Sequence, residues 1–180
     1  MDFNKAIELN AKNEKAWHNR GLTKYGLKDF EGAIQDHAKA IELNPAYSNA
    51  YNDRGIARIK LKDQDGALKD FNKAIEIDPG YATAYINRAG IRYTSKDYSG
   101  ALSDYGKFIE LKPDNADGYT GRANARMGLK DYTGALPDYN KAIAINPNAV
   151  SALISRGNAR ARKDNASVGL RPKLYAAAIL

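Results

Sequence analysis

The sequence contains no cysteine and only two histidines in 180 residues. Disulfides and thiolate metal sites are therefore excluded, and neither a glycine-rich phosphate loop nor the ligand spacing of a zinc site occurs. The longest apolar run is far shorter than the roughly 20 residues that a membrane-spanning helix needs. These absences predict a chain with no cofactor, no catalytic activity and no membrane insertion.

What the sequence does contain is a strict repeat. Prolines recur 34 residues apart, and most of them close a version of the phrase Lys-Ala-Ile-Glu-Leu-Asn-Pro found at residues 39–45. A constant interval of this length is typical of a helix-turn-helix array, in which each unit buries its apolar face only by stacking on its neighbours. The four prolines are Pro45, Pro79, Pro113 and Pro147.

Each unit resembles the tetratricopeptide repeat family when places are counted from Glu14, Ser48, Ala82 and Ala116. An aromatic residue fills the fourth place and alanine the twentieth, as in that family. The resemblance implies an all-α fold, a right-handed α-solenoid of stacked helix-turn-helix repeats. The residues at these two places are Trp17, Tyr51, Tyr85 and Tyr119, then Ala33, Ala67, Ala101 and Ala135.

Two residues depart from the family pattern. His37 occupies the twenty-fourth place, where the other repeats have aromatic rings, so we expect a packed imidazole whose hydrogen bonds are satisfied. Phe108 replaces the small residue of the twenty-seventh place, and this bulky ring predicts wider local packing.

The resemblance covers residues 14–149 as four complete repeats, with partial units on either side. Residues 1–13 copy a second helix and predict that the chain is a fragment of a longer array. Residues 164–180 break the motif and are either a terminal capping helix or added, non-native sequence. The expected units are 1–13, 14–47, 48–81, 82–115, 116–149, 150–163 and 164–180.

Apolar spacing and breakers also predict the helices. The aspartates Asp29, Asp63, Asp97 and Asp131 are expected to cap the second helices, and a glycine three residues after each is expected to allow close approach of the paired helices. First helices are expected at 14–27, 48–61, 82–95, 116–129 and 150–162, and second helices at 1–10, 30–43, 64–77, 98–111 and 132–145.

A net charge of +7 raises the question of nucleic-acid binding. Most of this excess recurs at fixed places of the repeat, which assigns it to the scaffold, and nucleic acid is therefore not the expected partner. The arginine column is Arg20, Arg54, Arg88, Arg122 and Arg156, and the matching aspartate column is Asp2, Asp36, Asp70, Asp104 and Asp138.

These two columns are expected to form a ladder of ion pairs, because a repeated inward charge needs a repeated partner. Arg20 can pair with Asp36 inside one repeat, or Arg54 can pair with Asp36 between repeats. The between-repeat register is preferred, since it also gives Arg156 a partner in Asp138.

By resemblance, a peptide or partner segment lies in a concave groove lined by the first helices. Amides there suit an extended backbone, and aliphatic side chains suit apolar pockets. The lysine and asparagine pattern with which cochaperones of the family bind a C-terminal carboxylate is absent. The expected groove residues are His18, Asn19, Leu22, Tyr25, Asn52, Ile56, Ile59, Ile86, Asn87, Tyr93 and Asn124.

The sequence therefore favours a non-catalytic scaffold for protein–protein interaction, whose partner is a protein or peptide ligand. Two alternatives stay open, a regulatory arm cut from a larger enzyme and a basic solenoid that binds nucleic acid. Self-association through the uncovered ends of the array is also expected, because an exposed apolar helix face can be covered by a second copy.

Overall fold

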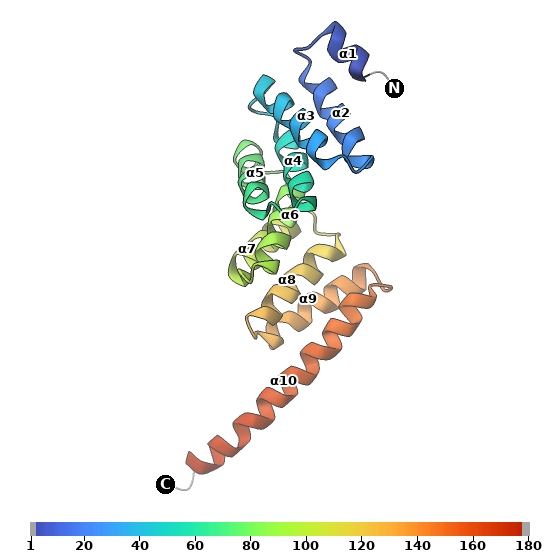
Figure 1. Cartoon of the computed structure of the whole chain (residues 1–180). Helices are drawn as coiled ribbons and strands as arrows, with labels where there is room; N and C mark the ends of the chain where they lie inside the picture. Colours follow the sequence, from blue (N-terminus) through green and yellow to red (C-terminus); the bar gives the residue numbers. More distant parts are fainter. Residues whose placement is uncertain (1–2, 178–180) are drawn as a thin grey trace. The chain divides into compact units, whose positions relative to one another are not determined.

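The computed structural model describes the backbone of residues 3–177 and the side chains of residues 3–165. The described backbone is all helix and turn, which confirms the all-α class (Figure 1). The helices are α1 (Phe3–Leu9), α2 (Glu14–Gly26), α3 (Phe30–Leu43), α4 (Ser48–Lys60), α5 (Gln64–Ile77), α6 (Ala82–Thr94), α7 (Tyr98–Leu111), α8 (Ala116–Gly128), α9 (Tyr132–Ile145) and α10 (Val150–Ala177).

The helices α2 to α9 begin where the sequence predicts and end within one residue of the prediction. The expected helix end at residue 162 is wrong, because α10 continues to Ala177. In the complete repeats a Lys-Asp pair follows one residue after the end of the first helix, and Asp164-Asn165 stands at the matching places of α10. The signal that stops a first helix is thus missing there. Residues 1 and 2 of the expected opening helix lie outside the described residues.

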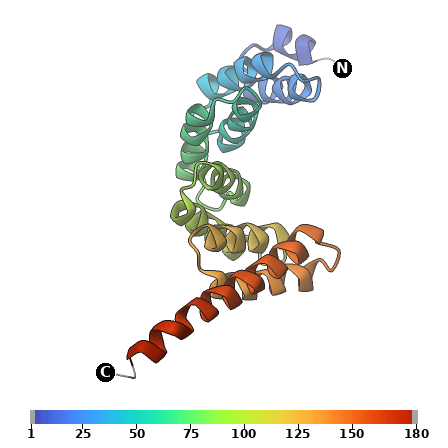
Figure 2. The same ribbon diagram turned by 60° about the horizontal axis from the view of Figure 1, so that its bottom comes forward.

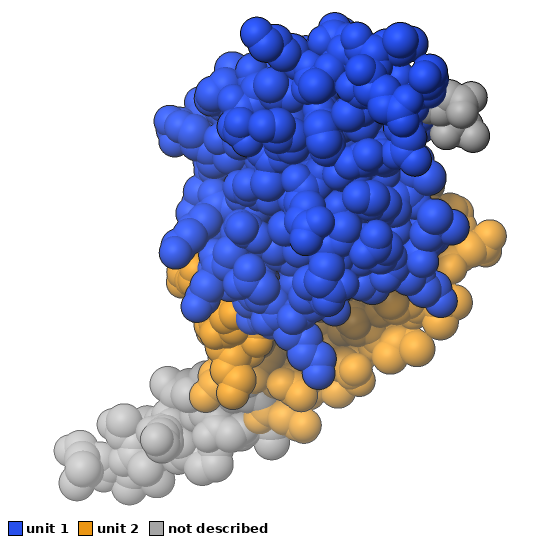
Figure 3. Space-filling model, turned by 45° about the horizontal axis from the view of Figure 1, so that its top comes forward, with its two compact units in different colours: residues 1–91 blue, residues 92–180 orange. Residues whose placement is uncertain are grey.

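The chain divides into two compact units, residues 1–91 and 92–180 (Figure 3). In unit 1, α2 packs against α3, α3 against α4 and α4 against α5. In unit 2, α8 packs against α7 and α9, and α9 against α10, as both ribbon views show for α8 and α9 (Figure 2). Each unit is therefore built from consecutive helix pairs.

Within a pair, a small residue on the first helix faces a ring on the second. A β-carbon added at Gly55 would lie 2.8 Å from Phe71 Cε1, and one at Gly21 would lie 2.7 Å from His37 Cε1. Both rings are fully buried. Glycine at these places lets the ring lie directly on the backbone of the first helix, which sets the close approach of the two helices.

The turn inside each complete repeat places a lysine in the left-handed region. Lys62 has φ 63°, and the N–H of Asp63 returns to the carbonyl of Arg58 at 3.0 Å. This is the hydrogen-bond pattern of a Schellman motif, in which glycine is the usual residue at the left-handed position. The same conformation recurs at Lys28, Lys96 and Lys130.

Replacing Lys62 by glycine should therefore raise the free energy of unfolding by about 0.5–1 kcal/mol. Glycine relieves the strain of the left-handed conformation, and the extra conformational freedom that it gives the unfolded chain offsets only part of this gain. Lys60→Gly is the matched control. Lys60 is the last residue of α4, where glycine is unfavourable in a helix, so this variant should be less stable than the unaltered chain. Urea unfolding of both variants provides the measurement. A loss of stability in Lys62→Gly would contradict the strain argument.

The expected aspartate caps are confirmed. Asp63 Oδ1 accepts a hydrogen bond from the N–H of Gly66 at 2.9 Å, and Asp29, Asp97 and Asp131 cap their helices in the same way. The role expected for the glycine is wrong, however. A β-carbon at Gly66 would collide with the Asp63 carboxylate itself, so glycine makes room for the cap and not for the partner helix.

Phe108, around which wider packing is expected, faces a smaller residue on the next helix than its counterparts do. A β-carbon at Gly118 would lie 2.6 Å from Phe108 Cδ1, and the corresponding place of the other repeats carries alanine. The methyl group lost at Gly118 makes room for the ring, which is 5% exposed. The substitution on α7 is thus compensated on α8.

Candidate binding surface

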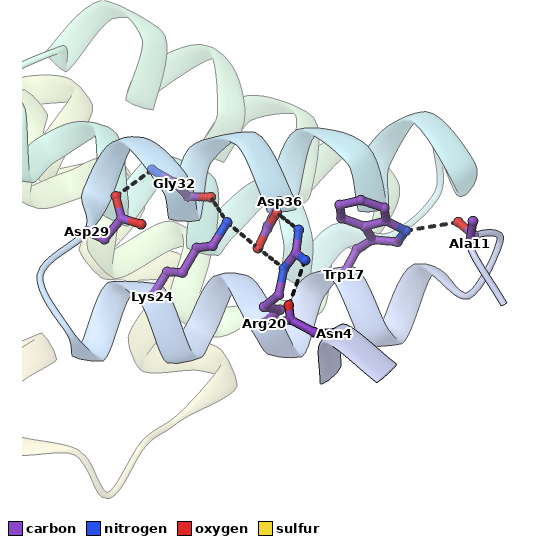
Figure 4. Close-up of polar contacts among 8 residues, drawn as sticks. All are labelled: Asn4, Ala11, Trp17, Arg20, Lys24, Asp29, Gly32 and Asp36. Carbon is purple, nitrogen blue, oxygen red and sulfur yellow. Dashed lines mark hydrogen bonds and ion pairs between the residues drawn. The ribbon is translucent and has the colours of Figure 1, made fainter. Parts of the chain in front are cut away.

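Buried ion pairs join the two helices of a repeat. Arg20 Nε and Nη2 donate to the two carboxylate oxygens of Asp36, each at 2.7 Å (Figure 4). Asp36 is 2% exposed. A bidentate contact of this kind is stronger and more directional than a single hydrogen bond. The same fork recurs in Arg54 with Asp70 and in Arg122 with Asp138.

The structure therefore adopts the within-repeat register, and the preferred between-repeat register is wrong. Arg20 and Asp36 lie equally far from Lys28 in the turn, so antiparallel helices bring them face to face. Toward the preceding repeat, an asparagine instead of an aspartate is the contact of Arg20, Arg88 and Arg156. Arg20 donates to Asn4 at 2.9 Å, Arg88 to Asn72 at 2.7 Å, and Arg156, for which Asp138 was expected, to Asn140 at 3.0 Å. Asp2 lies outside the described residues.

A second cation reaches each buried aspartate from one turn further along the first helix. Lys24 Nζ lies 2.9 Å from Asp36 Oδ2, and Arg58, Arg92 and Arg126 repeat the contact. Burial opposes ionisation of Asp36, but the hydrogen bonds from Arg20 and Lys24 outweigh it and hold its pKa below the ordinary value. The hydrogen bonds that Arg20 donates to Asp36 in turn raise the pKa of Arg20. These repeated charges thus stabilise the scaffold.

A chain of polar contacts links α2, α4 and α6 in unit 1. His18 Nε2 lies 2.8 Å from Asp53 Oδ2, and His18 Nδ1 lies 3.2 Å from the hydroxyl of Tyr47. Asn52 donates to Asp53 Oδ1 at 3.0 Å, and Asn87 donates to Asn52 Oδ1 at 3.0 Å. Successive repeats are therefore joined by side chains at the fifth and sixth places of their first helices.

This network changes the role of two expected groove residues. His18 is 5% exposed and Asn52 is 1% exposed. Their side chains are used in hydrogen bonds with Asp53 and Asn87 of the following repeat. Neither offers a free polar group to a ligand. The other expected groove residues remain at the surface: Asn19, Leu22 and Ile59 are exposed, and Tyr25, Ile56, Ile86, Asn87, Tyr93 and Asn124 are half-buried.

His37 is buried as expected, but its hydrogen bonds are not satisfied. The side chain is fully buried, and neither ring nitrogen has a hydrogen-bond partner among the described residues. Burial lowers the pKa of His37 to about 4, and the neighbouring ring of His18, whose centroid is 5.2 Å away, acts in the same direction. The imidazole is therefore held in its neutral form at pH 7.

A small cavity opens on the first helices of unit 1. It measures about 90 Å³ and is lined by Leu22 and Tyr25 of α2, Asp53 and Ile56 of α4, and the ring of His37. Three of the lining residues belong to the expected groove. The structure thus brings neighbouring groove positions of two repeats together around one space.

A larger cavity of about 270 Å³ opens in unit 2. It brings together the expected residues Tyr93 and Asn124 with Met127 and Gly128, which also stand at groove places of the fourth repeat, but sequence reasoning missed the other half of its wall. The signal was available, because three of the missed residues stand at groove places of the partial repeat that begins at residue 150. The wall consists of Tyr93, Asn124, Met127, Gly128, Tyr139, Ser155, Asn158 and Arg162.

The described side chains include no group of three or more His, Cys, Asp or Glu residues placed to hold a metal ion. Across the same part of the chain, no helix combines the length and apolarity needed to cross a membrane.

Solved structures share this fold at low sequence identity. The crystal structure of MamA protein is 21% identical with a TM-score of 0.73, over 82% of this chain and 81% of that chain. MamA 41-end from Desulfovibrio magneticus RS-1 is 19% identical with a TM-score of 0.79, over 88% and 89%. The first TPR of Spaghetti (RPAP3), bound to HSP90 peptide SRMEEVD, is 21% identical with a TM-score of 0.64, over 67% and 96%.

No curated protein matches the sequence. The model of the family described as Tetratricopeptide repeat matches residues 14–47, 48–81 and 116–149. These segments make up more than half of the chain and coincide with three of the four complete repeats. The chain belongs to the tetratricopeptide repeat family.

Proposed function

We propose that the chain is a non-catalytic scaffold that holds an extended segment of a partner protein along its first helices. The observation that carries this proposal is the location of the two cavities. Each is lined mainly by first-helix positions whose residues differ between repeats, whereas the repeated charges are used in ion pairs inside the scaffold. Cavities lined by apolar groups and a few polar groups, like the one in unit 1, are where side chains of a ligand anchor, and the cavity of unit 2 offers mainly polar groups.

The peptide complex of the structurally similar Spaghetti domain supports the same use of the fold. In this chain Leu22 and Ile56 would supply apolar contact in unit 1, and Tyr93 and Met127 would supply it in unit 2. The half-buried amide of Asn124 would hydrogen-bond to the ligand. His18 and Asn52 would act indirectly, because they hold neighbouring first helices together.

The test is peptide binding to single alanine variants, with a peptide selected from a random library against the full chain. Leu22→Ala and Tyr93→Ala should each weaken binding by at least about 1 kcal/mol, roughly fivefold, because anchors in a cavity dominate binding energy. Leu61→Ala is the matched control, since Leu61 is 39% and Leu22 42% exposed but Leu61 lies in the turn after α4.

The control should bind as the unaltered chain does, with an unchanged helical signal in all variants. Equal binding by all three variants would place the binding surface elsewhere. If binding fell instead on neutralising Lys62, Lys96 and Lys130, and weakened steeply with salt, the nucleic-acid alternative would replace the proposal.

A further inference from the structure

The cavity of unit 2 presents hydrogen-bond donors that have no acceptor in the described chain. The fully buried hydroxyl of Tyr139 donates to Asn124 Oδ1 at 2.7 Å, which fixes the orientation of that amide. Burial raises the pKa of Tyr139 to about 12, so the phenol keeps its proton. With its oxygen occupied, Asn124 offers its NH2 group to the cavity, and this group has no partner among the described residues.

Arg162 adds a cation to the same wall. Ser155, Asn158 and Arg162 are spaced three and four residues apart, so they lie on one face of α10. The arginines that recur on the first helices are used inside the scaffold, as Arg122 and Arg126 are with Asp138. For Arg162, by contrast, the described part of the chain supplies no ion pair, and no Asp or Glu lines the cavity.

The continuation of α10 gives Arg162 a setting that the matching places of the complete repeats lack. In the complete repeats, the place of Arg162 is the last residue of a first helix and holds Gly26, Lys60, Thr94 or Gly128. In α10 the helix continues past that place, which positions Arg162 within a helix, one turn beyond Asn158.

We propose that the cavity of unit 2 binds a carboxylate group of the partner segment. Arg162 would form the charge-assisted contact, with amide donors from Asn124 and Asn158 beside it. Tyr93 and Met127 would contact the aliphatic stem. A volume of about 270 Å³ suits one side chain or a chain end. The carboxylate can come from an acidic side chain or from a C-terminus, and the inference rests on the proposed function of peptide binding.

Two random peptide libraries distinguish these sources. In one the peptides are fused at their C-terminal end and have no free carboxyl terminus, and in the other the terminus is free. Each is selected against the full chain. We expect enrichment of Glu or Asp at one position in the first library if a side chain is bound, or enrichment only in the second if the terminus is bound.

Arg162→Gln should then weaken binding of the selected peptide about tenfold or more, and replacing the enriched acid by its amide should do the same. Arg160→Gln is the matched control, because Arg160 is an exposed arginine of α10 that does not line the cavity. The double change, amide peptide with Arg162→Gln, should cost little more than either change alone.

The outcomes separate this inference from the proposed function. Peptides that bind without an acidic preference, or that bind Arg162→Gln as well as Arg160→Gln, overturn the inference and leave the scaffold function standing. Failure of the full chain to select any peptide overturns both. As a second measurement, N-acetylglutamate amide is titrated by NMR against N-acetylglutamine amide, or N-acetylalanine against its amide if the free terminus was selected. Equal shifts of the Asn124 and Asn158 side-chain amides with acid and neutral probe would also overturn it.

Discussion

Phenylalanine in place of His37 is expected to stabilise the chain at every pH from 5 to 8, and most strongly at the acidic end. At pH 7 the gain should be about 1–3 kcal/mol, the cost of burying a polar group without a hydrogen-bond partner. A phenylalanine ring fits such a slot, because Phe71 occupies the equivalent slot against Gly55 in the next repeat.

The pH dependence follows from the lowered pKa of His37. The unfolded chain binds a proton below about pH 6.5, whereas the folded chain resists it until about pH 4. The titration of His37 therefore leaves the stability of the chain unchanged above about pH 6.5 and lowers it as the pH falls from 6.5 towards 4. Between pH 7 and pH 5 the loss should be about 2 kcal/mol.

Charged and titratable groups from three helices surround this ring. His18 on α2 and Arg54 on α4 oppose protonation of His37, and Asp53 on α4 and Asp36 on α3 favour it. Because all of them remain in the His37→Phe variant, the difference between the variant and the unaltered chain isolates the contribution of His37.

Urea unfolding at pH 5, 6, 7 and 8 measures this difference. The reciprocal variant, Phe71→His, is the matched control and should lose stability and acquire a similar dependence on pH. Parallel stability curves for the unaltered chain and His37→Phe would show that the buried imidazole does not titrate as argued.

The second large effect is expected at Asp70. Asp70→Asn should lower the free energy of unfolding by about 3 kcal/mol, because it leaves Arg54 and Arg58 without a buried negative charge. Arg54 Nη2 lies 2.6 Å and Arg58 Nη1 2.8 Å from this carboxylate, which is 3% exposed. The side chains of Arg54 and Arg58 are 16% and 24% exposed, so water can partly hydrate them, and the expected loss is near the lower end of the range for a buried ion pair.

Glu76→Gln is the control for Asp70→Asn. It removes the exposed pair of Glu76 with Lys73 at 2.6 Å on the same helix, and exposed pairs contribute about 0–1 kcal/mol. Thermal and urea unfolding of both variants give the comparison. A loss in Asp70→Asn no larger than that in Glu76→Gln would mean that the column of buried aspartates contributes nothing beyond ordinary surface pairs.

Parts of the candidate surface were predictable and parts were not. Tyr93 and Asn124 line a cavity as residues of the expected groove, and Ser155, Asn158 and Arg162 would have followed from extending the same places into the partial repeat. The burial of His18 and Asn52 had no such signal. It depends on Asp53 and Asn87, which lie one repeat further along the chain and meet their partners only when helices stack.

The sequence by itself determined helices α2 to α9, their aspartate caps and the 34-residue repeat, because these depend on hydrogen bonds and spacing within a few turns of chain. Only the tertiary structure decided which aspartate each arginine meets, since two registers satisfy the same pattern and the antiparallel packing about the turn selects one. It also decided that His37 has no hydrogen-bond partner and that Gly118 makes room for Phe108. Both outcomes depend on which atoms of two different helices come into contact, and the repeat pattern does not encode that.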